Sequence, residues 1–248
     1  MATIRRYKVV LLILGALIFL GIRILAATDQ YFEWSLLYIS NGMIARGIDT
    51  LKRSVILSQN DLEPQLLLAM AYSAEGNYTK AIPEYRRALQ IAPHEIFIWA
   101  LLGNAYQETG NSNAAKAAFE TVLRSDPESV TALVGLGKIA LSSGQQTQAE
   151  EYFKKAIQLS PGRYSGYLEL ADVYQALGRN MDAVAVLKEG IKKAPGYPEL
   201  AYRLGALLEK LGKKEEALVY YKLALQWDPA FSTAKEAVDR LSRLGKAA

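Results

Sequence analysis

The 248-residue sequence contains no cysteine and a single histidine, His94. The absence of cysteine excludes disulfide bonds, thiolate metal sites and cysteine nucleophiles, although it does not indicate a redox compartment. Metal sites and catalytic triads that use histidine place it beside partner side chains, whereas a lone histidine directly after a proline is typical of a surface turn. We therefore assign no chemistry to His94, and the sequence predicts no cofactor, no metal site and no catalytic residue.

Excess charge is also absent from most of the sequence. The net charge is +4, and residues 1–27 contain four basic residues and no acidic residue, so the rest of the chain is neutral. A protein that binds nucleic acid needs an excess of basic residues on its folded body. The sequence therefore predicts no nucleic-acid partner. Proline is scarce, with 8 residues, and 51% of the residues are hydrophobic, so the chain can bury a core.

Residues 9–27 form an apolar segment that predicts a membrane-spanning helix. Arg23 is the only charged residue in the segment, and near the distal end its long side chain can reach the interface. The segment approaches the length of about 20 residues that a spanning helix needs. The basic residues within 1–8, with Asp29 and Glu33 after the segment, favour a cytoplasmic N-terminus. We therefore expect a single-pass protein of a cell (inner) membrane, with its main body on the extracytoplasmic, periplasmic side.

A cleaved signal peptide is the alternative interpretation of this segment. The basic start and apolar stretch fit it, and "LAA" before Thr28 is a tolerable cleavage site. The near-spanning length favours a retained anchor.

The remainder of the sequence repeats with a period of 34 residues. Near copies of one motif, "YRRALQIAP", "FKKAIQLSP" and "YKLALQWDP", begin at Tyr85, Phe153 and Tyr221, and looser versions lie midway at 119–127 and 187–195. A fixed period of this length is typical of stacked supersecondary units. The five repeats begin at Leu62, Ile96, Val130, Tyr164 and Pro198.

Each repeat reads as two antiparallel helices. Glycine at position 15 predicts a left-handed turn after the first helix, and proline at position 32 ends the second. Position 8 is alanine or glycine, position 20 is alanine and position 24 is large, which predicts that the large side chain fills the space beside the small one. The residues at position 15 are Gly76, Gly110, Gly144, Gly178 and Gly212. Those at position 24 are Tyr85, Phe119, Phe153, Leu187 and Tyr221.

Residues 28–61 fit the same template as a sixth, degenerate repeat. Trp34 and Gly42 occupy positions 7 and 15, and Gln59 replaces the proline. Because no proline occurs between residues 9 and 41, we expect the spanning helix to continue nearly straight into the first repeat helix.

Residues 232–248 are predicted to form a C-terminal capping helix and tail. Asp239 stands at position 8, where a second helix would need glycine or alanine for close packing. A polar terminal element of this kind keeps a repeat array soluble. The predicted inner face consists of Ala234, Ala237, Val238 and Leu241.

These residues resemble the tetratricopeptide repeat (TPR) family, and the chain looks like a membrane-anchored bacterial type. The second of the five repeats matches the family pattern most fully, and the resemblance covers residues 28–231, of which 62–231 are the five regular repeats. The resemblance implies an all-α fold, a right-handed α-α superhelix of six repeats plus the capping helix, preceded by one transmembrane helix. The matching residues are Trp99, Leu102, Gly103, Tyr106, Ala115, Phe119 and Pro127.

The resemblance also implies a concave groove lined by the first helices, at positions 2, 5, 6, 9, 12 and 13. The N-terminal end of this groove is apolar, and it is as consistent with internal packing, or with contact to the membrane helix or lipid, as with an open binding surface. The apolar residues are Phe32, Leu36, Ile39, Leu66, Met70 and Phe97. The polar residues are Asn104, Gln107, Lys138, Asp172, Gln175, Tyr202, Arg203 and Glu209.

Relatives that grip chaperone C-termini hold a terminal carboxylate with lysine, asparagine and arginine at set groove positions. Asn104 is present here, but Ala100 stands where lysine is required, and Gly135, Ser165 and Glu169 occupy later clamp positions. We therefore do not expect carboxylate-clamp recognition.

Several local motifs are explained by their repeat positions. Within "GLGK", Gly137 and Lys138 occupy positions 8 and 9, and the spacing of a phosphate-binding loop is missing. Pro83 at position 22 is expected to loosen the first turns of its helix. The pairs Glu150–Glu151 and Glu215–Glu216 are expected on the exposed starts of second helices, where acids are favourable.

We expect a membrane-anchored scaffold that binds segments of other proteins in its groove and assembles or stabilises a membrane or extracytoplasmic protein complex. A permanent structural subunit of a membrane complex is the alternative, and an enzyme is a remote one, since the repeats, anchor and cap account for the chain. No small-molecule substrate is predicted.

Overall fold

The computed structural model of the protein describes residues 29–58 and 60–244. Within these ranges the chain is helical and contains no strand, which confirms the predicted all-α class. None of the helices in these ranges is long and apolar enough to cross a membrane. The predicted membrane-spanning segment 9–27, like the basic residues 1–8, lies outside the described residues.

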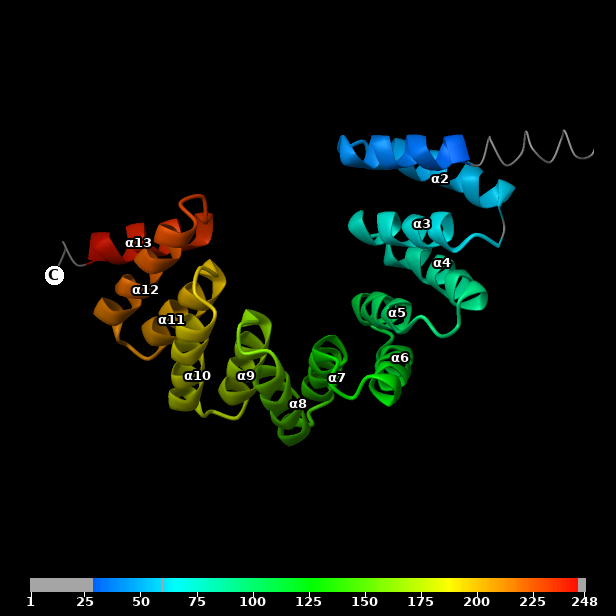
Figure 1. Cartoon of the computed structure of the whole chain (residues 1–248). Helices are drawn as coiled ribbons and strands as arrows, with labels where there is room; N and C mark the ends of the chain where they lie inside the picture. The colour runs from blue at the N-terminus through cyan, green and yellow to red at the C-terminus, as the bar shows by residue number, and fades with distance from the viewer. Residues whose placement is uncertain (1–28, 59, 245–248) are drawn as a thin grey trace, which may run out of the picture. The chain divides into compact units, whose positions relative to one another are not determined.

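The helices follow one another as antiparallel pairs (Figure 1). Residues 29–40 form the first described helix. The later helices are α2 (Ile44–Leu57), α3 (Leu62–Ala74), α4 (Tyr78–Ile91), α5 (Ile96–Glu108), α6 (Ser112–Ser125), α7 (Val130–Ser142), α8 (Gln146–Leu159), α9 (Tyr164–Ala176), α10 (Asn180–Lys193), α11 (Pro198–Lys210), α12 (Lys214–Trp227) and α13 (Ser232–Leu244).

The chain divides into two compact units. The N-terminal unit ends at Ala115, within α6, and the C-terminal unit begins at Lys116. In each unit, helices that are neighbours in the sequence are neighbours in space, as expected for stacked helical repeats.

The turn between the two helices of a repeat depends on its glycine. Gly76 follows α3 with φ +72°, a conformation that a side chain at this residue would disfavour. Its N–H donates to the Ser73 carbonyl, and the Asn77 N–H donates to the Tyr72 carbonyl. This pair of hydrogen bonds satisfies carbonyls that would otherwise be left unpaired at the end of α3. The other position-15 glycines, together with Gly42, have φ between +72° and +79°, so the predicted turns are confirmed.

The packing of large on small residues is also as predicted. The position-24 side chains of Tyr85, Phe119, Phe153, Leu187 and Tyr221 are all buried, and so are the position-20 alanines. Small residues at position 8 leave the space for these large side chains. A Cβ atom added to Gly205, at position 8 of its repeat, would lie 2.8 Å from the Tyr221 ring. The two helices of a repeat therefore approach closely.

Aromatic residues at position 4 connect the start of a first helix to the end of the preceding second helix. The Trp99 indole N–H donates to the Pro93 carbonyl at 3.1 Å, and the Tyr167 hydroxyl donates to the Pro161 carbonyl at 3.0 Å. Both carbonyls belong to the proline that ends a second helix, so the aromatic residue satisfies an acceptor at that end.

Helix α13 packs as the predicted cap. Ala234, Ala237 and Leu241 are buried and Val238 is half-buried, whereas Asp239 is exposed. The position-8 residue of this helix therefore faces solvent, as the sequence predicts for a capping helix.

Two local expectations were wrong. Helix α4 runs unbroken through the exposed Pro83. Proline has no N–H to donate to the carbonyl four residues before it. Since α4 begins at Tyr78, that carbonyl lies in the first turn, and the rest of the helix keeps its hydrogen bonds. Glu215 and Glu216 lie exposed in the first turn of α12, as expected, but α8 begins at Gln146, so Glu150 lies beyond its first turn. Glu150 is also largely buried and hydrogen-bonded, as described below.

Candidate protein-binding surface

The predicted groove residues fall on first helices in both units. The apolar residues lie on residues 29–40, α3 and α5 of the N-terminal unit, together with Asn104 and Gln107. The remaining polar residues lie on α7, α9 and α11 of the C-terminal unit. Each half of the predicted groove therefore belongs to one of the two units.

The apolar residues divide into packed and exposed side chains. Phe32, Ile39 and Leu66 are partly buried and pack against the hydrophobic core of the N-terminal unit. The three others are exposed, and we name them the apolar face: Leu36 at 45%, Met70 at 42% and Phe97 at 48%. Internal packing therefore explains half of the predicted set and leaves the apolar face without a partner among the described residues.

Asn104 and Gln107 continue this surface along α5. Asn104 is exposed and Gln107 is half-buried. Their amide groups can each donate and accept hydrogen bonds, which suits recognition of a peptide backbone or of polar side chains.

In the C-terminal unit, charged residues of successive first helices pair with each other. Lys138 on α7 forms an ion pair with Glu169 on α9 at 2.9 Å, and Asp172 on α9 forms one with Arg203 on α11. Each pair joins position 9 of one repeat to position 6 of the next, a separation of 31 residues. The charges that the sequence assigns to the polar end of the groove are therefore neutralised within the fold.

Glu209 is held in a similar way by the capping helix. Arg240 of α13 donates to both carboxylate oxygens of Glu209, at 2.7 and 2.9 Å, and the Tyr221 hydroxyl donates to the same carboxylate at 2.7 Å. Burial and the hydrogen bond to Glu209 raise the pKa of Tyr221. Glu209 thus links the last repeat to its cap.

The two remaining predicted residues of this unit are half-buried. The Tyr202 ring lies 5.6 Å from the Tyr221 ring and 5.4 Å from the Phe231 ring, between centroids, and so belongs to an aromatic cluster beside the cap. Gln175 is half-buried on α9. Neither residue adds to an exposed apolar surface.

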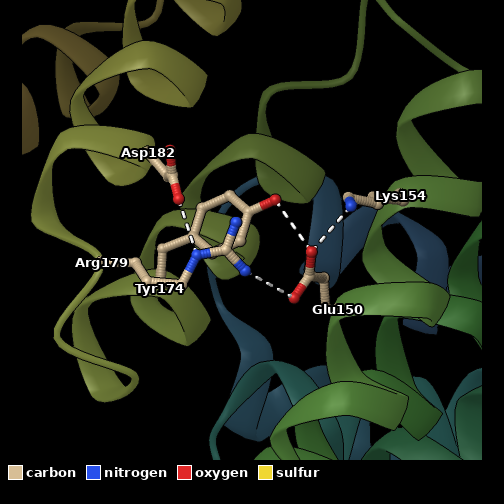
Figure 2. Close-up of polar contacts among 5 residues, drawn as sticks. All are labelled: Glu150, Lys154, Tyr174, Arg179 and Asp182. Atoms are coloured by element: carbon tan, nitrogen blue, oxygen red, sulfur yellow. Dashed lines mark hydrogen bonds and ion pairs between the residues drawn. The ribbon is translucent and has the colours of Figure 1, made fainter.

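A polar cluster centred on Glu150 was missed by the sequence analysis (Figure 2). The Glu150 side chain, only 16% exposed, accepts from Lys154 at 2.7 Å and from Arg179 at 3.3 Å. The Tyr174 hydroxyl donates to it at 3.0 Å, and Arg179 also binds Asp182 at 2.6 Å. The Arg179 guanidinium lies 4.3 Å from the centroid of the Tyr174 ring, within the range of a cation–π contact.

The environment of Glu150 stabilises its charged form. The hydrogen bond from Lys154 lowers the pKa of Glu150 below its ordinary value of 4.5, and the Tyr174 hydroxyl and the charges of Lys154 and Arg179 act in the same direction, although partial burial opposes them. Since every charged member of the cluster is paired, we interpret it as a connection between α8, α9 and α10 rather than as a reactive site.

A cavity of about 670 Å³ lies between α2, α3 and α4. Two polar residues of its wall share a partner, because the buried Gln65 donates to Glu84 at 2.6 Å and Arg87 donates to the same carboxylate at 2.8 Å. The lining residues are Val55, Ile56, Asn60, Gln65, Arg87, Gln90 and Ile91. The periodic pattern did not predict this cavity, since its wall combines residues of three helices.

The described residues contain no group of three or more histidine, aspartate or glutamate side chains placed to hold a metal ion. His94 is exposed in the turn between α4 and α5, as the sequence predicts.

Models of tetratricopeptide repeats match most of the chain. One matches residues 101–164 and 168–234, a second matches 61–128 and a third matches 140–195. No curated protein sequence matches this chain.

Several solved structures share this fold at low sequence identity. TTC0263, a thermophilic TPR protein of Thermus thermophilus, has a TM-score of 0.62 and 23% identity, and the similarity covers 73% of this chain and 98% of that one. Pseudomonas aeruginosa pilF has a TM-score of 0.63 and 20% identity, covering 85% and 96%. YrrB, a TPR protein with an unusual peptide-binding site, has a TM-score of 0.50 and 20% identity, covering 75% and 96%.

The 34-residue period, the paired helices with their positive-φ glycines and the matches to three repeat models agree with one another. The chain belongs to the tetratricopeptide repeat family.

Proposed function

We propose that this chain is a scaffold that binds segments of other proteins, and that the apolar face of Leu36, Met70 and Phe97 is where they dock. The exposure of these three side chains on successive first helices is the observation that supports the proposal most directly. Covering the exposed half of such a side chain contributes about 1 kcal/mol. The three together contribute about 3 kcal/mol, so a partner must make further contacts around them to bind stably.

The YrrB structure is described as that of a TPR protein with an unusual peptide-binding site. Peptide binding by a chain of the same fold supports a binding role here. In this chain, the described residues 29–58 and 60–244 form helical repeats and a cap. This composition of the chain favours a scaffold over an enzyme.

We further propose that residues 9–27 anchor the protein in a cell membrane, with the N-terminus cytoplasmic and the repeats on the periplasmic side. The apolar residues 9–22 and 24–27 support the anchor, and the three basic residues before the segment, with Asp29 and Glu33 after it, support this orientation. The scaffold would then assemble or stabilise a membrane or extracytoplasmic complex. Protease treatment of intact spheroplasts tests the orientation, because repeats on the periplasmic side are degraded without lysis, whereas cytoplasmic repeats survive until lysis.

Site-specific crosslinking tests the binding surface. A photoreactive amino acid that replaces Met70 in the full-length protein is expected to crosslink a defined set of partners in native membranes. Adding the substitution Phe97→Ser to this variant should abolish those crosslinks. The control position is Val219, which is exposed and apolar but lies on the second helix α12. Identical products from both positions would contradict a specific apolar face.

The stoichiometry of the crosslinked partner distinguishes two forms of the proposal. Exchangeable, substoichiometric partners indicate an assembly factor. A single partner that co-purifies in fixed ratio after detergent extraction indicates a permanent structural subunit.

A further inference from the structure

The first helices of the N-terminal unit carry acidic residues and no basic residue. Helix 29–40, α3 and α5 contain neither lysine nor arginine. Their acidic residues occupy repeat positions 2, 6 and 13, on the same predicted face as Leu36, Met70 and Phe97. These four exposed residues, which we name the acidic rim, are Asp29, Glu33, Glu63 and Glu108.

Among the described residues of this unit, the basic ones lie on its second helices. The two ion pairs found among its described residues, Lys52–Asp49 and Arg87–Glu84, are each formed within one second helix. The acidic rim takes part in no ion pair between described residues. The basic residues are Arg46 and Lys52 with Arg53 on α2, and Lys80 and Arg86 with Arg87 on α4.

The C-terminal unit shows the opposite arrangement. There, Lys138 and Arg203 on first helices pair with carboxylates of α9, and Arg240 on the capping helix α13 pairs with Glu209 of α11. Basic residues are thus placed among the acids of the first helices in one unit and are excluded from them in the other. The negative charge beside the apolar face is left for a partner to neutralise.

We propose that the apolar face and the acidic rim together bind an amphipathic protein segment whose apolar stripe is flanked by lysine or arginine. This inference rests on the proposed function, since it names the chemistry of the segment that docks at the same surface. An amphipathic helix that lays its apolar residues on a groove is an established mode of recognition. Complementary charges at the rim accelerate association and disfavour partners of the wrong sign.

The lack of basic residues on these first helices disfavours two other classes of ligand. Nucleic acids and anionic lipid surfaces bind proteins through exposed lysine and arginine, which are lacking on these first helices. A basic protein segment is therefore the occupant that satisfies both the apolar and the electrostatic character of the surface.

Three synthetic peptides test the inference with the full 248-residue chain in detergent. The first is a helix-forming peptide with a leucine stripe flanked by lysine, and the second has the same stripe flanked by glutamate. The third keeps the lysines but replaces the leucines by serine. Fluorescence anisotropy gives each Kd at low salt and at about 0.5 M salt, where charges are screened over a few ångströms.

We expect the lysine-flanked amphipathic peptide to bind at least about tenfold more tightly than either control, with an affinity that falls several-fold at high salt. The triple substitution Glu33→Gln, Glu63→Gln, Glu108→Gln is expected to weaken it about tenfold. A matched triple in the C-terminal unit, Glu151→Gln, Glu189→Gln, Glu215→Gln, removes three exposed acids from second helices and should leave the Kd unchanged. Unfolding curves of both triple variants verify that the fold is retained.

Two outcomes overturn the inference, and they are distinguishable. Equal binding of the lysine- and glutamate-flanked peptides, lost on Met70→Ser and Phe97→Ser substitution, refutes the basic partner but supports docking at the apolar face. Binding that is insensitive to the Met70→Ser and Phe97→Ser substitutions refutes the apolar face and, with it, the inference.

Discussion

A Cβ atom on Gly137 would lie 2.5 Å from the Cε1 atom of the Phe153 ring. The glycine is at position 8 of its repeat and the phenylalanine is at position 24, so the first and second helices of the repeat meet where one has no side chain. Real Cβ atoms do not approach a ring carbon so closely, and the Phe153 side chain is fully buried. The contact therefore fixes the distance between α7 and α8.

Gly137→Ala is expected to destabilise the protein by about 1–3 kcal/mol, because overpacking against Phe153 outweighs the higher helix propensity of alanine. Urea unfolding followed by circular dichroism measures the change. Gly162→Ala is the control, since a Cβ atom there meets nothing within 4 Å, and we expect its effect to stay within about 0.5 kcal/mol. Adding Phe153→Leu to Gly137→Ala should cost less than the two single changes together, and full additivity would show that the two residues do not oppose each other.

Substitution of Gly144 is expected to lower the stability through backbone strain rather than through packing. Its φ is +73° and a Cβ atom there meets no neighbour within 4 Å, so Gly144→Ala should cost about 1 kcal/mol from left-handed strain alone. Asparagine tolerates this conformation better than alanine. Gly144→Asn should therefore lose measurably less stability in the same unfolding experiment, and an equal loss for the two variants would point to another cause.

The periodic features of this fold could be predicted from the sequence because they are local. Glycine at position 15 acts through its own φ, and the large residue at position 24 meets the small residue of its own repeat, as with Phe153 and Gly137. The capping helix was predictable for the same reason, since Ala234 and Leu241 lie on one face of a single helix.

Interactions that join different repeats could not be predicted in this way. Alignment of the repeats compares residues at equal positions, whereas Lys138 pairs with Glu169 between positions 9 and 6. The Glu150 cluster is still less visible, because Arg179 reaches Glu150 from another repeat through a side-chain conformation. The exposure of individual side chains could not be predicted either. Phe32 and Leu36 are both predicted apolar groove residues, but Phe32 packs against the core whereas Leu36 is exposed to solvent.

Reversing the charges of Asp172 and Arg203 tests whether the ion pairs set the contact between first helices. Asp172→Arg alone places two guanidinium groups side by side and should destabilise the protein by about 0.5–1 kcal/mol. The double change Asp172→Arg, Arg203→Asp should recover most of that loss, with the recovery smaller at high salt. Double-mutant unfolding cycles give the coupling energy. A double variant as unstable as the sum of its two single variants would show that the pair contributes nothing.

The Glu150 cluster predicts a dependence of stability on pH. The pKa of Glu150 is lowered in the folded protein, so the unfolded chain takes up a proton first as the pH falls. The contribution of its charge is therefore fully present above the ordinary value of 4.5 and is lost as the pH falls below it. At neutral pH, Glu150→Gln should lower the stability by about 1 kcal/mol, since it removes charge-assisted hydrogen bonds from Lys154 and Arg179. Once the pH falls through the lowered pKa of folded Glu150, the difference in melting temperature between the two proteins should disappear. Glu151→Gln, at the exposed neighbouring residue, should match the wild type across the range, and a Glu150→Gln deficit that persists undiminished at low pH would show that the carboxylate charge is not what stabilises the junction.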